Sequence, residues 1–259
     1  MGQFFLSAID IVTKYREFLL RGIGYTMLVA LVGTVIGLVI GLATGILRTC
    51  PTSKNPVVRG LQKVCSGIIA CYVEIFRGTP MMVQAMVIYW GYAFATGSKL
   101  PMIPSAILIV SINTGAYMAE IVRGGIISID KGQFEGAAAV GMTHWQTMIH
   151  VVLPQVLRNI LPSVANEFVI NIKDTSVLNV IGVTELFYFA TKISKDNYLI
   201  FETYLVVCVI YFILTFSITR LLRLIEKKLQ GADSYVICGS QSDSNAEIRV
   251  KKQPEVPND

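Results

Sequence analysis

Three long stretches of this chain carry no charged residue, and they limit its fold more than any other feature. Residues 22–47, 78–98 and 100–119 are 26, 21 and 20 residues long and contain no Asp, Glu, Lys or Arg. About 20 apolar residues in a helix, at ~1.5 Å each, cross the ~30 Å hydrocarbon core of a bilayer. Charged residues make up only 15% of the chain, against roughly 25% in soluble domains. The sequence therefore predicts an all-α membrane protein.

Apolar runs predict about five transmembrane helices in all. We expect them at about residues 23–47, 64–95, 103–122, 154–182 and 200–219. The second is interrupted by charged residues and Pro80, and the fourth contains several polar residues. Residues 185–199, between the last two spans, are predicted to be a polar connection.

The first span carries a glycine at every fourth position, namely Gly33, Gly37, Gly41 and Gly45. Residues four apart lie on the same face of a helix. Small residues at this spacing let a second helix approach closely, and contact with lipid alone does not favour them. We therefore expect this face to pack against another helix.

The two ends of the chain are more polar than its centre. Residues 1–21 place apolar side chains at helical spacing, with Asp10 and Glu17 between them, which predicts an amphipathic helix on the membrane surface. Residues 22–228 form the predicted transmembrane domain. Residues 229–259 are polar and are predicted to be a disordered cytoplasmic tail.

Five spans place the two termini on opposite sides of the membrane, and the basic residues indicate which side is which. Residues 48–63, 123–158 and 220–228 together hold eleven Lys and Arg residues, whereas the connections on the other side hold six. Lys and Arg accumulate in cytoplasmic loops. The sequence therefore predicts that the N-terminus is outside and the C-terminus is cytoplasmic.

Enzyme, metal and nucleic-acid chemistry find no support in the sequence. It lacks a G-x-x-x-x-G-K-[ST] loop for holding ATP. His144 and His150 are six residues apart, and the five cysteines include no C-x-x-C pair, so neither set has metal-ligand spacing. The net charge of +5 is typical of basic cytoplasmic loops. We expect no cofactor, no metal and no nucleic acid to be bound by this chain.

Two polar stripes at membrane depth are the candidate functional site. In the third span, Asn113, Tyr117 and Glu120 are four and three residues apart and so share one helical face. Five residues of the fourth span fall within an arc of roughly 140°, namely Ser163, Asn166, Glu167, Asn171 and Asp174. Because an acidic residue costs on the order of 2.5–3.5 kcal/mol at a membrane helix centre, such groups face a bundle interior or a watery cavity.

Both stripes allow a structural as well as a functional interpretation. The fourth-span stripe favours a substrate path or gate. The run Lys173-Asp174-Thr175-Ser176 is a place where the helix can loosen and offer backbone groups to a zwitterion, as broken helices do in transporters. Glu120 or Arg123 can instead pair with Glu74 or Arg77 merely to hold helices together.

The most specific motif lies in the polar segment 123–154. Glu135-Gly136-Ala137-Ala138-Ala139-Val140-Gly141 is followed by nine residues and then by Val151-Val152-Leu153-Pro154. This resembles the EAA loop of ABC importer permeases: Glu135, Ala137, Gly141, Leu153 and Pro154 match the pattern, while Gly136 replaces an alanine and Val151 an isoleucine. The glycine at 136 is expected to loosen the helix by about 1 kcal/mol relative to alanine.

Three further blocks are similar to polar amino-acid permeases of the histidine, glutamine and arginine type. They are Phe76-Arg77-Gly78-Thr79-Pro80, then Ala116 to Ile126 followed by Lys131-Gly132-Gln133, and then Lys173 to Val177 ending near Ile181 to Leu186. Together the resemblance covers about residues 20–228. It implies an ABC importer permease (MetI-like) fold with a cytoplasmic coupling helix.

The resemblance also implies partners and site residues. Expected partners are a dimer of ABC ATPase subunits that uses ATP and Mg, a second permease subunit, an external amino-acid-binding protein and membrane lipid. ATPase coupling is expected at Glu135, Gly136, Ala137, Gly141, Leu153 and Pro154. The two polar stripes and the 173–176 run, rather than the resemblance, give the residues expected to bind substrate: Asn113, Tyr117, Ser163, Asn166, Glu167, Asn171, Lys173, Asp174, Thr175 and Ser176.

Two other functions stay open at the level of sequence. An ion-coupled secondary amino-acid transporter would use Glu167 and Asp174 for coupling, although the inverted repeats expected for that class are not visible. A membrane scaffold without transport would leave the polar stripe unexplained. The sequence also leaves open which amino acid is carried and whether the permease pairs with itself or with a relative.

Overall fold

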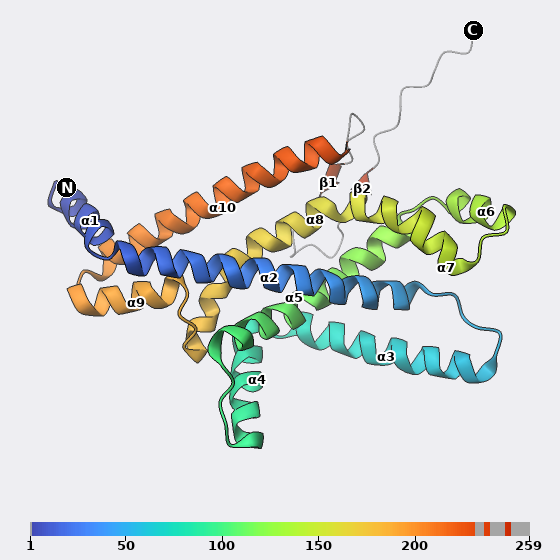
Figure 1. Cartoon of the computed structure of the whole chain (residues 1–259), viewed down its shortest axis with the longest axis horizontal. Helices are drawn as coiled ribbons and strands as arrows, with labels where there is room; N and C mark the ends of the chain where they lie inside the picture. Colours follow the sequence, from blue (N-terminus) through green and yellow to red (C-terminus); the bar gives the residue numbers. More distant parts are fainter. Residues whose placement is uncertain (1, 231–235, 239–246, 250–259) are drawn as a thin grey trace, which may run out of the picture.

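Figure 1 shows the computed structural model, which describes residues 2–230, 236–238 and 247–249. The described residues are almost entirely helical. In chain order the elements are α1 (Gly2–Lys14), α2 (Arg16–Thr49), α3 (Pro56–Gly78), α4 (Met81–Thr96), α5 (Met102–Ile127), α6 (Lys131–Ala139), α7 (His144–Thr147), the π-helix η1 (Met148–Val152), α8 (Leu153–Asp174), the 3-10 helix η2 (Thr175–Ile181), α9 (Leu186–Asn197), α10 (Ile200–Gln230), β1 (Val236–Cys238) and β2 (Glu247–Arg249). Helices α1 and α9 lie at one end of the molecule, and α6 and α7 lie at the other.

The central contact of the bundle is that of α2 with α5, and it uses the predicted glycine stripe. The four glycines from Gly33 to Gly45 are buried and face α5. A Cβ added at Gly37 would lie 2.8 Å from the Cβ of Thr114, and one at Gly45 would lie 2.7 Å from Cγ1 of Val122. Any side chain at these positions would therefore push the two helices apart. The prediction that this face packs closely against another helix is confirmed.

Four segments in the described part of the chain are long and apolar enough to cross a membrane. They are Arg16–Thr49, Met102–Ile127, His144–Ile181 and Ile200–Lys228, and they contain the first, third, fourth and fifth predicted spans. The second predicted segment, 64–95, is not among these four. It is divided between α3 and α4 at the interruption that the sequence indicated, and α4 turns away from α3 (Figure 1). Thr79 is extended, as expected for the residue before a proline, and this ends α3 at Gly78.

The N-terminal region differs from the prediction at its boundary. α2 begins at Arg16, so residues 16–21 belong to the long helix rather than to the surface helix. Ile11, Tyr15 and Leu19 are buried in a cluster with α9 and α10. Ile9 and Val12 are exposed on another side of α1. One apolar side of α1 therefore packs against the rest of the protein, and a second apolar side is exposed.

Residues 185–199 were expected to be a polar connection, but most of them form the helix α9. Leu186, Phe189, Ala190 and Ile193 recur at helical spacing and are buried, and part of this face packs on α2 and α10. Lys192 and Lys195 are exposed. The alternation of charged and apolar residues here reflects an amphipathic helix.

The tail contains structure that the prediction of disorder for residues 229–259 did not include. α10 continues to Gln230, and β1 pairs with β2 antiparallel, with Val236 opposite Arg249 and Cys238 opposite Glu247. Val236 and Ile237 are β-branched residues, which suit a strand. The other residues of the predicted tail lie outside the described ranges.

Candidate functional site

A small polar cavity lies where the α3–α4 break meets the middle of α5 and the end of α8. Its volume is about 130 Å³. It is lined by Thr79, Pro80, Met81, Asn113, Tyr117, Glu167, Ile170, Asn171 and Asp174. Five of the ten residues predicted to bind substrate, two from α5 and three from α8, therefore meet at one cavity.

Helical spacing explains why α5 and α8 deliver these side chains together. Asn113 and Tyr117 are four residues apart, as are Glu167 and Asn171, and Asp174 follows three residues later. Glu167 is only 3% exposed and Asn171 only 4% exposed. The exposed Arg77 is not a lining residue, but its guanidinium lies 5.5 Å from the centre of the Tyr117 ring. The cavity is therefore lined by two carboxylates from α8, and a guanidinium lies near one of its aromatic lining residues.

Asn171 has a second environment that bears on its predicted role. Its Nδ2 donates to Oγ1 of Thr34 on α2, at 2.8 Å, and to Oγ1 of Thr114 on α5, at 3.0 Å. Both donors of this amide are used to join three helices at the bundle centre. The geometry therefore assigns Asn171 a packing role even though it touches the cavity.

The other five predicted substrate residues do not line this cavity. Asn166 and Lys173 are exposed. The hydroxyl of Thr175 donates to the Ile172 carbonyl and that of Ser176 donates to the Lys173 carbonyl, and Ser163 is half-buried away from the lining. The predicted loosening of the chain at 173–176 takes the form of a change from the α-helix α8 to the 3-10 helix η2 at Thr175.

Sequence reasoning missed Gln84, the buried amide that completes the α3–α4 break. Its Nε2 lies 2.9 Å from the carbonyl oxygens of Phe76 and Thr79, and its Oε1 accepts from Nδ2 of Asn113 at 2.9 Å. The signal was available, because a glutamine in the otherwise apolar run of α4 is an expensive residue at membrane depth.

Sequence reasoning also missed the role of Glu185. This fully buried carboxylate caps α9 by accepting from the backbone N–H groups of Phe187 and Tyr188, at 2.8 and 2.6 Å. It also accepts from the Tyr211 hydroxyl of α10 at 2.9 Å. Burial raises the pKa of the Glu185 carboxyl, and these three hydrogen bonds oppose the shift. The residue holds the start of α9 against α10.

Glu120 holds helices together, as the structural interpretation proposed, but it does not pair with Arg77. It forms ion pairs with Arg48 of α2 and with Arg123, one turn along α5. Arg123 donates to its Oε2 from Nε at 3.0 Å and from Nη2 at 2.8 Å. Glu120 thus joins α2 and α5 next to the segment that leads into α6. It is not among the residues that line the cavity.

The EAA segment folds into a short helix with defined ends. Asp130 caps α6 by accepting from the Gly132 N–H at 2.6 Å. After α6, the N–H of Met142 donates to the Ala137 carbonyl and that of Gly141 donates to the Ala138 carbonyl, both at 3.0 Å. This pair of bonds is a Schellman motif, which needs a left-handed residue after the helix. Gly141 supplies it with φ of +79°.

The chain after Gly141 returns to the bundle through two more short elements. Thr143 and Gln146 form a capping box at the start of α7. The π-helix η1 follows, and α8 begins at Leu153 with Pro154 in its first turn. Pro154 has no N–H to donate to the preceding turn, and the wider π-helical turn η1 ends two residues before it. Leu153 is half-buried, and Pro154 is exposed.

Much of the segment from Lys131 to Val152, which we call the coupling segment after its predicted role, is exposed. Glu135 and Gly136 face outward, whereas Ala137 is buried with 6% exposure. Val140, Trp145 and Ile149 are large apolar residues with 76%, 54% and 53% exposure. They belong to the segment around α6 and α7, which lies at the end of the molecule opposite to α1 and α9 (Figure 1).

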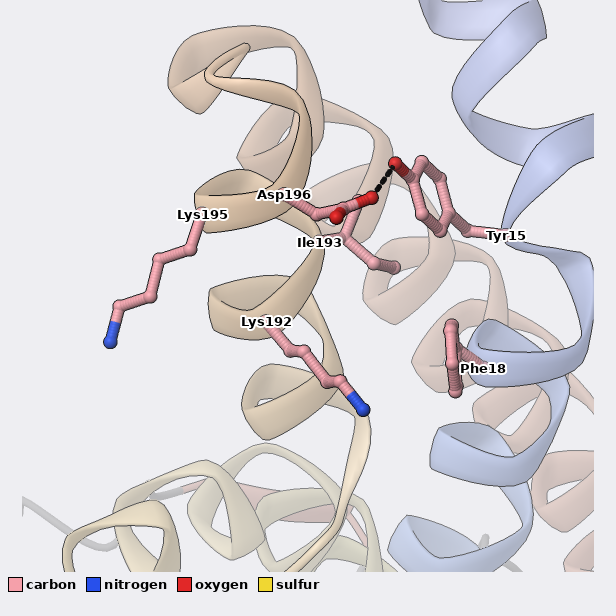
Figure 2. A pocket seen from close by; sticks show the side chains of 6 residues that line it. All are labelled: Tyr15, Phe18, Lys192, Ile193, Lys195 and Asp196. Carbon is pink, nitrogen blue, oxygen red and sulfur yellow. Dashed lines mark hydrogen bonds between the residues drawn. The ribbon is translucent and has the colours of Figure 1, made fainter.

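A second and larger cavity lies between the N-terminal helices and α9. Figure 2 shows its six lining residues, in which the Tyr15 hydroxyl donates to the Asp196 carboxylate. The ammonium of Lys192 lies 4.8 Å from the centre of the Phe18 ring. This cavity of about 440 Å³ contains none of the predicted site residues. Within the described residues, no group of three or more His, Cys, Asp or Glu side chains is placed to hold a metal ion.

Comparisons with known proteins identify close relatives of this arrangement. Residues 57–231 match the family described as binding-protein-dependent transport system inner membrane component. The chain is 37% identical over 168 residues to the glutamine transport system permease protein GlnP of Escherichia coli K12, which covers 64% of this chain and 77% of that protein. It is 34% identical to a putative glutamine transport system permease of Rickettsia bellii over 205 residues, covering 79% of this chain and 88% of the relative.

Solved structures share the fold. A crystal structure of an amino acid ABC transporter with histidines matches with a TM-score of 0.72 and 33% identity, over 84% of this chain and 96% of the other. The MetNI methionine ABC transporter in an inward-facing conformation matches with a TM-score of 0.70 and 21% identity, over 83% of this chain and 98% of the other. The second likeness bears on the fold alone.

Proposed function

The chain belongs to the family of binding-protein-dependent transport system inner membrane components, and we propose that it holds a polar amino acid in the cavity between the α3–α4 break, α5 and α8. It is the multi-pass inner-membrane permease subunit of an ABC importer for amino acids. ATP is hydrolysed by a separate subunit, so this chain is not an enzyme and binds no cofactor. An ion-coupled secondary transporter is therefore not the function of this chain.

The observation that carries the proposal is one small polar cavity that is lined by two carboxylates and by Tyr117, whose ring contacts the Arg77 guanidinium. The carboxylates of Glu167 and Asp174 line it and suit the ammonium of an amino acid. The guanidinium of Arg77, which lies over the Tyr117 ring, suits the α-carboxylate. Arg forms charge-assisted hydrogen bonds with carboxylates. A free amino acid carries both of these charges whatever its side chain.

Glutamine is our first candidate for the cargo, because two similar permeases are named for glutamine transport. A cationic amino acid is the second candidate, because two carboxylates line the cavity and one of them can face a basic side chain. Competition separates the two. Uptake of labelled glutamine is measured in vesicles with the ATPase and binding protein present, against an excess of unlabelled arginine, lysine or asparagine.

Substitutions of the two carboxylates test the site itself. We expect Glu167→Gln and Asp174→Asn, which keep volume and remove charge, to reduce uptake at least tenfold while the thermal stability of the subunit changes little. Asn166→Ala, an exposed change on the same helix, is the matched control and should transport normally. Unchanged uptake in both carboxylate variants would contradict the assignment of the cavity as the substrate site.

The coupling segment is proposed to be the docking site of the ATPase. The exposed Val140, Trp145 and Ile149 support this, because an exposed apolar cluster of this kind marks a protein contact. The rigid ends of α6, set by Asp130 and Gly141, suit a helix that transmits a push. Movement of an ATPase dimer would then rock α8 and α5 relative to a second permease subunit and expose the cavity to each side in turn.

We further propose that the N-terminus is outside and the C-terminus cytoplasmic. The connection between α2 and α3 lies at the same end of the molecule as α6 and α7, and α1 and α9 lie at the other end (Figure 1). The two connections with the basic excess, 48–63 and 123–158, are thus on one side. An external amino-acid-binding protein would meet the end that carries α1 and α9.

A further inference from the structure

Gln84 lies at the centre of a hydrogen-bonded cluster that joins three helices. We call this cluster, made of Phe76, Thr79, Gln84 and Asn113, the lock. The side chain is only 7% exposed. Its Nε2 lies 2.9 Å from the Phe76 carbonyl, the Thr79 carbonyl and the Thr79 hydroxyl. Nδ2 of Asn113, on α5, donates to Gln84 Oε1 at 2.9 Å and to the Phe76 carbonyl at 3.3 Å. One side chain of α4 thus joins the end of α3 to α5.

The lock supplies hydrogen-bond donors for carbonyl groups that the break between α3 and α4 leaves unpaired. The last four carbonyl groups of a helix have no partner within that helix. Such a carbonyl group destabilises the fold when it is buried without a hydrogen-bond partner. The Thr79 hydroxyl donates a hydrogen bond to the Ile75 carbonyl. The Phe76 and Thr79 carbonyls instead accept hydrogen bonds from side-chain amides of α4 and α5. Pro80, which starts α4, has no N–H to offer.

The residues held by the lock form one wall of the substrate cavity. Thr79, Pro80 and Met81 line the cavity, as does Asn113, but Gln84 does not. The carboxylates of α8 lie among the other lining residues. We propose that Gln84 is a positioning residue for transport: its amide holds the α3–α4 break against α5 and so keeps this wall in place around the amino acid. The proposal rests on the function proposed above for the cavity.

Two variants remove the donors of Gln84 in different ways. Gln84→Met keeps the length and volume of the side chain but removes all its hydrogen bonds. Gln84→Glu keeps the shape and the acceptor for Asn113 but replaces both donors by a carboxylate facing two carbonyls. Gln62→Met is the matched control, because Gln62 also bridges a bend, with bonds to Ser53 and Pro51, and lies outside the cavity.

The first measurement is the Kd of glutamine, and in parallel that of arginine, for the purified permease–ATPase complex, by calorimetry and without the binding protein. We expect Kd to rise about tenfold in both Gln84 variants, because a displaced wall would lose about one hydrogen bond to the bound amino acid. The basal ATP hydrolysis rate should stay within about twofold of wild type, since the coupling segment is unaltered. Gln62→Met should bind as wild type does. A wild-type Kd in both Gln84 variants would overturn the proposal.

The second measurement does not depend on substrate. Spin labels at the exposed positions Val87 of α4 and Leu108 of α5, in a cysteine-free background, report the distance between these helices. We expect a narrow distribution in the wild type and in Gln62→Met, and a broad one in both Gln84 variants. Narrow distributions in all four proteins would show that Gln84 does not hold the break. If the wild type binds no amino acid but the broadening occurs, the function proposed for the cavity fails and the lock stands.

Discussion

At the scale of single residues, we expect substitutions of Asn171 and Glu167, one turn apart on α8, to have different effects. Asn171→Ala removes the amide that joins Thr34 and Thr114. Hydrogen bonds between membrane helices are worth on average about 0.6 kcal/mol and at most about 1.7 kcal/mol, so we expect a loss of about 1–2 kcal/mol in the free energy of unfolding for the pair. Thermal unfolding of the purified subunit measures it. Glu167→Gln should leave that stability nearly unchanged and lose uptake. Equal stability of the two variants would remove the distinction between a packing residue and a cavity residue on this helix.

At the scale of an element, α6 depends on the residue that ends it. Gly141 has φ of +79°, and an L-residue held in this left-handed conformation costs roughly 1–2 kcal/mol. A Cβ added at Gly141 would meet no atom within 4 Å, so the penalty of Gly141→Ala comes from the backbone alone. We expect weaker recovery of the ATPase with the subunit and lower ATP-driven uptake, while the membrane bundle stays folded. Gly141→Trp adds bulk and should be more severe. Gly136→Ala, also in open space, is the control and should stabilise α6 by about 1 kcal/mol. Normal coupling in both Gly141 variants would contradict the docking role.

At the scale of the whole molecule, the proposed orientation can be tested by chemical labelling in intact cells. Cys50, Cys65, Cys71 and Cys208 are free thiols and are first replaced together with Cys238. A cysteine at the exposed Lys195 of α9 should then react with a membrane-impermeant maleimide added outside. A cysteine at Ser53, between α2 and α3, should react only after the cells are opened. The reverse pattern would invert the orientation inferred from the excess of Lys and Arg in the loops.

Much of the architecture followed from periodicity and composition. Long charge-free stretches indicate membrane helices because a charged group is costly in hydrocarbon, and four of the predicted spans are present as such. The glycines from Gly33 to Gly45 share one face because a helix has a fixed period, so their close packing was predictable without knowledge of the partner. Asn113 with Tyr117, and Glu167 with Asp174, were likewise predictable as polar faces at membrane depth.

The sequence by itself therefore determined most of the long apolar helices, several of their apolar and polar faces and the family, because these depend on local spacing and on the cost of burying polar groups. Only the tertiary structure decided which faces meet. Asn171 became a packing residue because Thr34 and Thr114, far away in the chain, lie opposite it. Gln84 became a lock because the break between α3 and α4 brings its side chain to the carbonyl groups that end α3. Such hydrogen bonds join residues from separate helices, and no local pattern specifies the partner that another helix brings.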